Sequence, residues 1–321
     1  MIRFGILGAG NIARRFAASL AHEPRASLAA ASCRTAEKAR AFLAGVPAEP
    51  AARAYGDHDE LLADADIDAI YLALPHQLHH AWALRALDAG KAVLCEKPAM
   101  LTAAEMAEVA DVARARGTLF MEAMKPRFVP LYPKVMDALS RIGALRRVEA
   151  TLCNDMLGAV AQAGSYHMTP GPGAGVLLDC GTYCASWIAA LAPERPQLVQ
   201  ARAELRDGID VYVDARYRCD GWEARLECAF DRARPRTATL VGERGRIVVE
   251  DLHRPQRAAV ELAGAPAQLL EAPYEVDDLF GEIRHFVGLV EAGETESPRM
   301  SLADSLACAQ LLDAARAGFA R

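Results

Sequence analysis

Lys97 is the first residue of this sequence whose type and position could do chemistry. It lies in the stretch Cys95-Glu96-Lys97-Pro98, directly after an apolar run at residues 92–94. An ammonium group at the carboxyl end of a buried strand is costly to desolvate, and open α/β sheets place their reactive groups at that edge. Only 5 of the 36 basic residues are lysines, so arginine is the ordinary solvated cation of this chain. We therefore expect Lys97 to be catalytic; the alternative is a strand-end lysine that extends its ammonium into water.

Asp179 and Tyr183 form a second candidate pair. They stand four residues apart in a predicted helix that is entered from the glycine-rich residues 171–178, and this spacing places both on one helix face. A carboxylate and a phenol on one face can both reach a substrate hydroxyl. The phenol, with an ordinary pKa of ~10, becomes a usable acid or base when an ammonium stabilises its anion, and Lys97 is the expected cation. The alternative is a core tyrosine bonded to a backbone carbonyl.

The N-terminal residues supply the elements that would position Lys97. A strand at residues 2–7 is followed by Gly8-Ala9-Gly10-Asn11-Ile12-Ala13, then by a helix towards residue 21 and a second strand at residues 27–33. In this G-x-G-x-x-A pattern the first glycine makes a tight turn, the second lets backbone approach a pyrophosphate, and the small last residue packs helix on strand. The helix N-terminus attracts the phosphates. We expect dinucleotide binding, with contacts from Gly8, Gly10, Asn11 and Ile12.

The end of the second strand indicates which dinucleotide is bound. An acidic residue there would read the adenosine ribose of NAD, but the sequence has Ser32, Cys33 and Arg34, with Lys38 one helical turn further on. A guanidinium and an ammonium suit a 2′-phosphate, so these four residues are expected to contact the cofactor and to favour NADP, with NAD possible. The alternative is that Arg34 pairs with Glu37 on a solvated helix start.

A buried strand at residues 69–74 ends at Pro75, and three histidines follow it at 76, 79 and 80. No carboxylate or thiol completes a ligand set with them, so we expect no metal. Histidines at this edge of the sheet are expected to border the nicotinamide. The expected cofactor contacts of this region are Leu74, Pro75, His76, His79, Glu96 and Lys97.

The order of elements predicts the fold class. Strands alternate with helices over some 120 residues, which is typical of a parallel, doubly wound α/β sheet, the Rossmann arrangement. After residues 125–130 the pattern changes to strands separated by turns, which indicates a meander. These strands are expected at residues 145–153, 209–217, 222–229, 237–241, 246–249 and 258–262.

These motifs together resemble the glucose-fructose oxidoreductase / inositol dehydrogenase / MocA family. The resemblance rests on Gly8 to Ala13, on Pro75-His76-Gln77-Leu78-His79, and on the run from Gly90 to Pro98, in this order. It implies a Rossmann domain, a second domain with an open, mostly antiparallel sheet, and NAD(P)-dependent hydride transfer on sugars, polyols or related alcohols. The family's Glu-Lys-Pro lysine is catalytic and corresponds to Lys97.

The second candidate pair resembles the same family. Residues Gly173 to Tyr183 match its Gly-Gly-Gly-x-Leu-x-Asp-x-Gly-x-His/Tyr motif, with Ala174 replacing one glycine. A tyrosine at the last position is similar to the branch of glucose-fructose oxidoreductase and dimeric dihydrodiol dehydrogenase, and implies that Tyr183 transfers the proton while Asp179 anchors a neighbouring hydroxyl.

The resemblance also implies a domain organisation. The nucleotide domain would span residues 1–123, with a C-terminal helix at about 300–321 packing back on it, and a substrate-binding and dimerisation domain would span 124–299. We expect a homodimer through the open sheet, because a broad face with many apolar residues would otherwise stay wet. His285 is expected to be structural.

Composition narrows the classes of function further. A net charge of -6 and a pI near 5.8 disfavour a nucleic-acid partner, which requires a concentrated basic face. Nothing approaches the length of a membrane span, and no secretory leader is apparent at the N-terminus. The eight cysteines include no Cys-x-x-Cys pair, so buried thiols in the cytoplasm are expected.

Two other classes of protein stay open. A redox-neutral glycosidase of the same superfamily would retain NAD and oxidise its sugar only transiently, and the apparent NADP preference disfavours it. A non-catalytic NADP-sensing protein would lack a working acid or base, and the presence of both Lys97 and Tyr183 disfavours it. The identity of the small polyhydroxy substrate depends on loops such as 154–164, which the sequence alone does not decode.

Overall fold

The computed structural model describes residues 1–162, 166–192 and 194–319, so the end of the 154–164 loop lies outside the described residues. The chain forms two compact units. The first consists of Met1–Met100, Ala104–Phe128 and Glu275–Ser305, and the second of Leu101–Ala103, Val129–Tyr274 and the residues from Leu306 onward. This division differs from the expected one, since residues 275–305 pack with the first unit and most of the last helix packs with the second.

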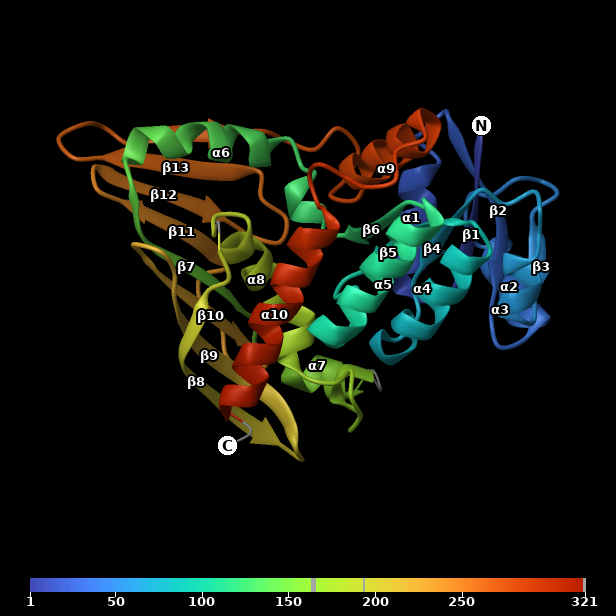
Figure 1. The fold of residues 1–321 in the computed structure, drawn as a ribbon, viewed down its shortest axis with the longest axis horizontal. Coiled ribbons are helices and arrows are strands. Elements are labelled where there is room, and N and C mark those ends of the chain that lie inside the picture. Colours follow the sequence, from blue (N-terminus) through green and yellow to red (C-terminus); the bar gives the residue numbers. More distant parts are fainter. Residues whose placement is uncertain (163–165, 193, 320–321) are drawn as a thin grey trace. The chain divides into compact units, whose positions relative to one another are not determined.

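The first unit contains a six-stranded parallel sheet with the order β3-β2-β1-β4-β5-β6 (Figure 1). The order reverses between β1 and β4, and right-handed crossovers then require helices on both faces. The predicted doubly wound Rossmann fold is therefore confirmed. Its strands are β1 (Ile2–Leu7), β2 (Ala26–Ser32), β3 (Arg53–Tyr55), β4 (Ala69–Leu72), β5 (Ala92–Glu96) and β6 (Phe120–Ala123). Its helices are α1 (Asn11–Leu20), α2 (Ala36–Leu43), α3 (His58–Leu62), α4 (His79–Asp88), α5 (Ala103–Arg116) and α9 (Phe280–Ala292).

Apolar runs place these strands in the interior. All residues of β4, β5 and β6 are buried, as expected for parallel strands covered on both faces. Phe16 of α1 stacks on Tyr71 of β4 with ring centroids 3.7 Å apart. Phe286 of α9 lies 5.8 Å from Phe4 of β1, which explains why this late segment belongs to the first unit.

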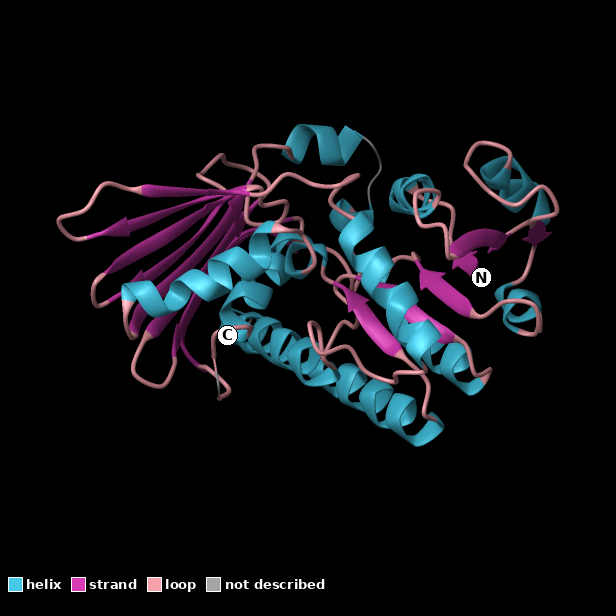
Figure 2. Ribbon diagram, turned by 90° about the horizontal axis from the view of Figure 1, so that it is seen from above, coloured by secondary structure: helices cyan, strands magenta, loops and turns pink. Residues whose placement is uncertain are grey.

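The second unit contains an eight-stranded sheet with the order β14-β13-β12-β11-β7-β10-β9-β8. Only β7 and β10 pair in parallel, so the expected open, mostly antiparallel sheet is confirmed; Figure 2 shows its strands fanning out. The strands are β7 (Leu145–Cys153), β8 (Gln197–Arg206), β9 (Ile209–Arg218), β10 (Glu223–Ala229), β11 (Thr237–Gly242), β12 (Gly245–Glu250), β13 (Arg257–Leu262) and β14 (Gln268–Glu271). The helices are α6 (Leu131–Ile142), α7 (Leu157–Gln162), α8 (Thr182–Ala189) and α10 (Leu302–Phe319).

Helices of the second unit pack on one face of this sheet. The Trp187 indole of α8 donates to the Leu252 carbonyl at 2.9 Å, and the Tyr217 hydroxyl of β9 donates to the Leu311 carbonyl of α10 at 2.8 Å. A Cβ on Gly318 would meet Leu198 and Ala201 of β8 within 3 Å. These contacts explain why α10 groups with the second unit from residue 306 onward.

The opposite face of the sheet carries charged residues, which corrects the expectation of a broad apolar surface. Arg225 of β10 binds Asp214 of β9 through two nitrogens at 2.9 and 3.0 Å, and Glu227 at 3.2 Å. Arg246 pairs with Glu261 across β12 and β13 at 2.7 Å. In the central strands β7, β9, β10, β12 and β13, polar positions alternate with buried ones over much of the strand, so one face forms the core and the other forms cross-strand ion pairs.

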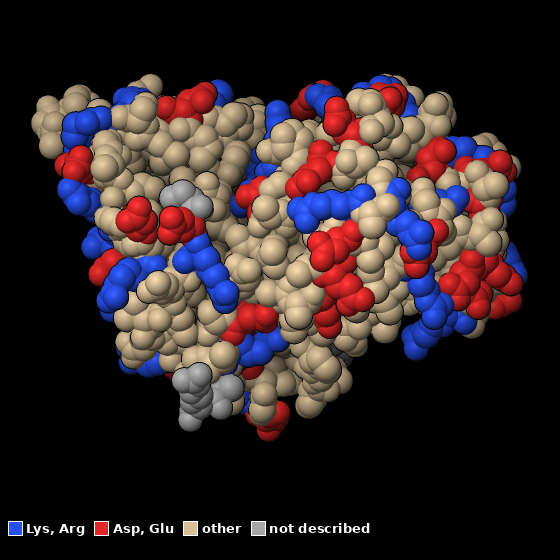
Figure 3. Space-filling model, in the orientation of Figure 1, with Lys and Arg blue, Asp and Glu red and all other residues tan. Residues whose placement is uncertain are grey.

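Acidic and basic side chains are interspersed on the face of the molecule seen in Figure 3. Within the described part of the chain, no helix has both the length and the apolar character needed to cross a membrane. None of the eight cysteines, all of which lie among the described residues, forms a disulfide.

Candidate functional site

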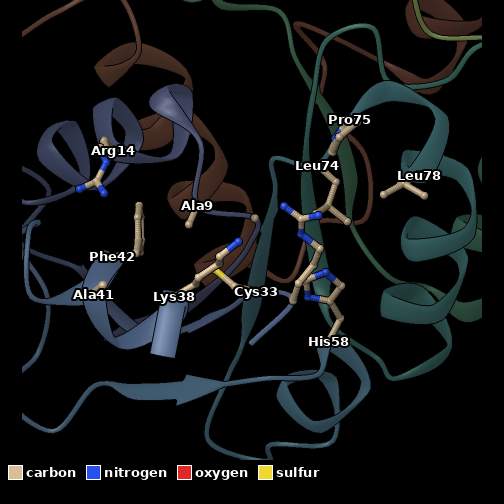
Figure 4. Close-up of a pocket in the computed structure, with 12 residues that line it drawn as sticks. Ala9, Arg14, Cys33, Lys38, Ala41, Phe42, His58, Leu74, Pro75 and Leu78 are labelled. Atoms are coloured by element: carbon tan, nitrogen blue, oxygen red, sulfur yellow. The ribbon is translucent and has the colours of Figure 1, made fainter. Parts of the chain in front are cut away.

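A cavity of about 700 Å³ opens in the first unit at the carboxyl ends of β1, β2 and β4. This is the edge where a doubly wound sheet binds its ligand, beside the point at which the strand order reverses. Figure 4 shows Arg14 and Phe42 on one side of the cavity and Leu74, Pro75 and Leu78 on the other. The twelve lining residues are Gly8, Ala9, Arg14, Cys33, Arg34, Lys38, Ala41, Phe42, His58, Leu74, Pro75 and Leu78.

The glycine-rich turn at this cavity has the form of a phosphate cradle. Gly8 adopts a φ of +97°, and a Cβ there would meet the Ala73 carbonyl oxygen at 2.5 Å, so only glycine fits. Gly10 precedes α1, and a Cβ on it would point into open space. Ala13 is fully buried, as the packing position of the motif requires. The first turn of α1, which begins with Asn11 and Ile12, contains no acidic residue, so the helix N-terminus suits an anion.

Three cations line the cavity, and none of the twelve lining residues is acidic. Arg34 and Lys38 are exposed, and within the described residues neither they nor Arg14 form an ion pair. The alternative pairing of Arg34 with Glu37 is not observed, because Glu37 pairs with Arg40 at 3.5 Å. The site therefore fits a ligand with several phosphate charges. Its cations could bind a pyrophosphate and also a further phosphate group on the same ligand.

Two of the predicted contacts at the end of β2 differ in exposure. Cys33 lines the cavity, and burial raises the pKa of its thiol, so it is a neutral, weakly polar wall. Ser32 is fully buried, and its hydroxyl lies 2.6 Å from Nδ1 of His58. Ser32 is therefore not available to a ligand directly, which corrects its assignment as a cofactor contact, and the cavity wall at this point is the His58 ring.

The segment after β4 contributes two of its four predicted residues to the cavity wall, Leu74 and Pro75. His76 is buried, with 3% of its surface exposed. His79 is completely buried, with Nε2 lying 2.8 Å from the Leu74 carbonyl oxygen and Nδ1 lying 3.1 Å from that of Pro98. Burial lowers the pKa of His79. Its expected place beside the nicotinamide is thus corrected: the ring joins the segment after β4 to the segment after Lys97.

Lys97 lies at the carboxyl end of β5 and is half-buried. Its backbone N–H donates to Glu96 Oε2 at 3.2 Å, and the Tyr71 hydroxyl donates to Glu96 Oε1. The Glu96 carboxylate is therefore turned to the interior, with only 8% of the residue exposed. Glu122 of β6 accepts from the Ala99 amide at 2.9 Å, so the segment that follows Lys97 is held from two sides.

A cluster of charged groups, most of them buried, joins α1 and α9 to the segment after β6. The Lys125 ammonium is 2.6 Å from Asp278 Oδ2, and Arg15 of α1 also binds Asp278. Glu282 of α9 is completely buried, and desolvation together with the nearby Glu96 charge raises its pKa well above the usual range. The Lys125–Asp278 and Arg15–Asp278 ion pairs stand at the start of α9 and link it to α1 and to the segment after β6.

In the second unit, Asp179 and Tyr183 do not lie on one α-helix. Asp179 belongs to a π-helical turn at Leu177–Gly181, and Tyr183 belongs to α8, which starts at Thr182. Four residues make about one turn in either type of helix, so what changes from the expectation is the type of helix and not the sharing of a face. Tyr183 is 8% exposed with its ring 5.7 Å from that of His253, and Asp179 Oδ1 lies 3.9 Å from Nε2 of His167.

Several residues of the two sites were not predicted from the sequence. Arg14 could have been found, because it follows the glycine motif by one residue and a cation one turn into such a helix lies near its N-terminus. Leu78 lies inside the predicted Pro75 to His79 segment. His58, His167 and His253 reach their sites only through tertiary packing, and their local sequence carries no signal of it.

The comparisons with known proteins agree with this architecture. A model of the GFO/IDH/MocA oxidoreductase family, described by its NAD-binding Rossmann fold, matches residues 2–124. A second model, for the GFO/IDH/MocA C-terminal domain, matches residues 137–248. The two matches cover the parallel sheet and most of the open sheet.

Individual relatives cover nearly the whole chain. Scyllo-inositol 2-dehydrogenase (NADP+) from Bacillus subtilis is 32% identical over 98% of this chain and 96% of its own length. Trans-1,2-dihydrobenzene-1,2-diol dehydrogenase from Mus musculus is 30% identical over the same shares, 98% and 96%. Among solved structures, a 3-ketoreductase from Actinomadura kijaniata in complex with NADP and TDP-benzene has a TM-score of 0.85, at 29% identity over 99% of this chain and 98% of that chain.

Proposed function

We propose, because this chain belongs to the GFO/IDH/MocA oxidoreductase family, that it is an NADP-preferring dehydrogenase or reductase acting on a CH–OH group. The substrate class that we propose is a sugar, a polyol or a dihydrodiol. The names of the relatives support this choice, since they include an inositol dehydrogenase that uses NADP+ and a dihydrodiol dehydrogenase.

The observation that carries the cofactor assignment is the cavity at the carboxyl edge of the parallel sheet. It combines the Gly8 turn, the open N-terminus of α1 and three cations that no carboxylate neutralises within the described residues. Gly8, Gly10, Asn11 and Ile12 would hold the pyrophosphate, and Arg34 and Lys38 would hold the adenosine 2′-phosphate. The absence of an acid at the end of β2 supports NADP over NAD.

When bound, the nicotinamide ring supplies the hydride chemistry by accepting or releasing a hydride. The chain's own residues would handle the proton. Tyr183 takes it from the substrate hydroxyl in oxidation and returns it in reduction, and Lys97 supplies the positive charge that favours the anionic phenol. Asp179 binds a neighbouring hydroxyl, and His167, 3.9 Å away, orients that carboxylate.

The roles of the two units follow from this assignment. The first unit would bind the cofactor, and the second, with Asp179 and Tyr183, would bind the substrate. Leu74, Pro75, His76 and Glu96 would act at the nicotinamide end, with Glu96 acting through the backbone of Lys97.

The proposal is tested with a panel of aldoses, polyols and trans-dihydrodiols, each incubated with NADP+ and followed by the absorbance of NADPH. We expect NADPH formation with one of these classes and much less with NAD+ as the acceptor. A protein that holds a co-purifying NAD, turns over glycosides and never forms free NADPH would contradict the proposal in favour of the glycosidase.

We also propose that the protein is a cytoplasmic homodimer that associates through the charged face of the open sheet. Ion pairs such as Arg246 with Glu261 offer a polar, self-complementary surface, and the unbridged cysteines suit a reducing compartment. Light scattering of the purified protein should give twice the chain mass, and a monomer at micromolar concentration would contradict the dimer.

A further inference from the structure

The residue at the end of β2 is where a Rossmann sheet usually reads the adenosine ribose. Here that residue is Ser32, which has none of its surface exposed and so cannot touch a ligand. Its hydroxyl instead lies 2.6 Å from Nδ1 of His58, the first residue of α3. His58 lines the cavity (Figure 4). The His58 imidazole therefore lines the cavity next to the strand end that usually contacts the ribose.

The Ser32 hydroxyl determines which ring nitrogen of His58 carries the proton. Among the described residues this buried hydroxyl has no hydrogen-bond partner besides His58, so its own hydrogen is satisfied only if it is donated to Nδ1. The neutral ring then carries its hydrogen on Nε2. Burial lowers the pKa of His58, with Asp57 and Asp59 opposing the effect, which is consistent with a neutral ring.

The orientation of the ring is fixed from a second side. The Trp82 ring of α4 meets it edge to face, with centroids 4.7 Å apart at 84°. The Arg85 guanidinium covers Trp82 at 4.8 Å and binds Asp59 of α3 at 2.6 Å. The imidazole is therefore held at the cavity wall by a hydroxyl and an indole, while no described residue binds Nε2.

We propose that His58 is a cofactor-specificity residue, whose Nε2–H donates a hydrogen bond to the phosphate on the adenosine 2′ position of NADP. The charge of that phosphate is met by the other polar groups of the same wall, Arg14, Arg34 and Lys38, none of which is paired within the described residues. Ser32 is a positioning residue that acts through His58. This inference rests on the NADP preference proposed above and adds the residue that reads the phosphate.

The test is calorimetric titration of NADP+ and NAD+ into wild type and variants, which requires no turnover. A hydrogen bond to a charged group supports a loss of roughly 10- to 100-fold in NADP+ affinity for His58→Phe, with NAD+ affinity changed less than about twofold. His58→Gln, whose amide can donate from a similar position, should recover most of the affinity. Ser32→Ala should lose an intermediate amount, because the ring then chooses its tautomer freely.

The control is His80→Phe, which changes a half-buried histidine of α4 that binds Glu108 and does not line the cavity. It should alter neither affinity, and a thermal melt of every variant checks folding. Equal losses for NADP+ and NAD+ in both His58 variants, or no loss in His58→Phe, would overturn the inference. If wild type itself bound the two cofactors equally, the proposed NADP preference would be wrong as well. If wild type prefers NADP+ and His58→Phe keeps that preference in full, only the role of His58 is wrong.

Discussion

The cations of the cavity and the cations on the outer face of the open sheet differ in what surrounds them. Arg34 and Lys38 are exposed and lack carboxylate partners within the described residues. Arg225 instead binds Asp214 and Glu227, each only 7% exposed, and hydrogen bonding by Asp214 raises its pKa. Cations that lie close together without carboxylate partners repel one another, and an anionic ligand removes that repulsion. Cations that already have carboxylate partners gain nothing comparable from a ligand. The comparison therefore separates residues that bind a ligand from residues that hold the fold.

The largest effects are expected from the proton-transfer residues, one in each unit. Lys97→Ala and Tyr183→Phe should each reduce turnover by roughly 10²- to 10⁴-fold while leaving NADP+ affinity nearly intact. Removing Lys97 should shift the alkaline requirement of kcat/KM to higher pH, because the phenol loses its cation, and removing Tyr183 should delete that limb. A pH series of kcat/KM on both variants measures this, and an unchanged profile in Tyr183→Phe would place the acid or base elsewhere.

The stabilising role of the ion-paired cations on the outer face is tested with Arg225→Leu. This change leaves two buried carboxylates without their cation, so we expect the free energy of unfolding to fall by about 2 to 4 kcal/mol, with NADP+ affinity unchanged. Denaturant unfolding of the variant and of wild type measures the loss. A variant as stable as wild type would show that these ion pairs of the outer face do not contribute to the free energy of unfolding.

The ligand-binding role of the unpaired cations in the cavity is tested with Arg34→Asp, which places an acid where an NAD-binding sheet has one. We expect NADP+ to bind roughly 10- to 100-fold more weakly and the order of NADP+ and NAD+ to reverse. The free energy of unfolding should stay within about 0.5 kcal/mol of wild type, because the side chain is exposed and unpaired. Arg40→Asp is the matched control, since Arg40 pairs with Glu37 on the same helix and does not line the cavity.

The smallest effect concerns His285, which pairs with no acid among the described residues and does not line the cavity. Its Nε2 lies 2.9 Å from the Ser297 hydroxyl, and burial lowers its pKa to about 4. The pKa of this histidine is about 6.5 in the unfolded chain and lower in the folded one. At a pH between these two values the unfolded chain binds a proton that the folded chain does not, so the free energy of unfolding falls as the pH drops through this window. Between pH 7.5 and pH 4.5, the free energy of unfolding should therefore fall by about 1 to 2 kcal/mol less in His285→Gln than in wild type. Urea unfolding of both proteins at both pH values measures this difference. An equal loss in both proteins would remove this role.

The regular parts of the fold could be predicted because their patterns are local. The strand at Leu145–Cys153 was predicted to its exact ends, since apolar and polar residues alternate along it between clear turns. The strand at Gln197–Arg206 was missed, because it forms the sheet edge and seven of its ten residues are exposed, which leaves little alternation to read. The edge strands at Arg53–Tyr55 and Gln268–Glu271 were missed as well, because they have only three and four residues and none of them is buried.

The sites could be predicted only where a motif carries them. Gly8, Arg34 and Lys97 stand in segments whose spacing follows from backbone and charge requirements. The inward turn of Glu96, the burial of His79 and the π-helical turn before Tyr183 depend on partners such as Tyr71 and the Leu74 carbonyl, which are distant in sequence or set by the backbone. Side-chain direction at a strand end is a tertiary property, so residue type alone does not determine it.

The central claim is that the cavity of the first unit reads a phosphate that NAD lacks. The most direct measurement is the ratio of the dissociation constants of NADP+ and NAD+ for the wild-type protein, determined by calorimetry in the same buffer at two salt concentrations. We expect NADP+ to bind roughly tenfold more tightly than NAD+, or better, and this advantage to shrink as salt rises because it comes from exposed charges. Equal dissociation constants, or tighter binding of NAD+, would contradict it.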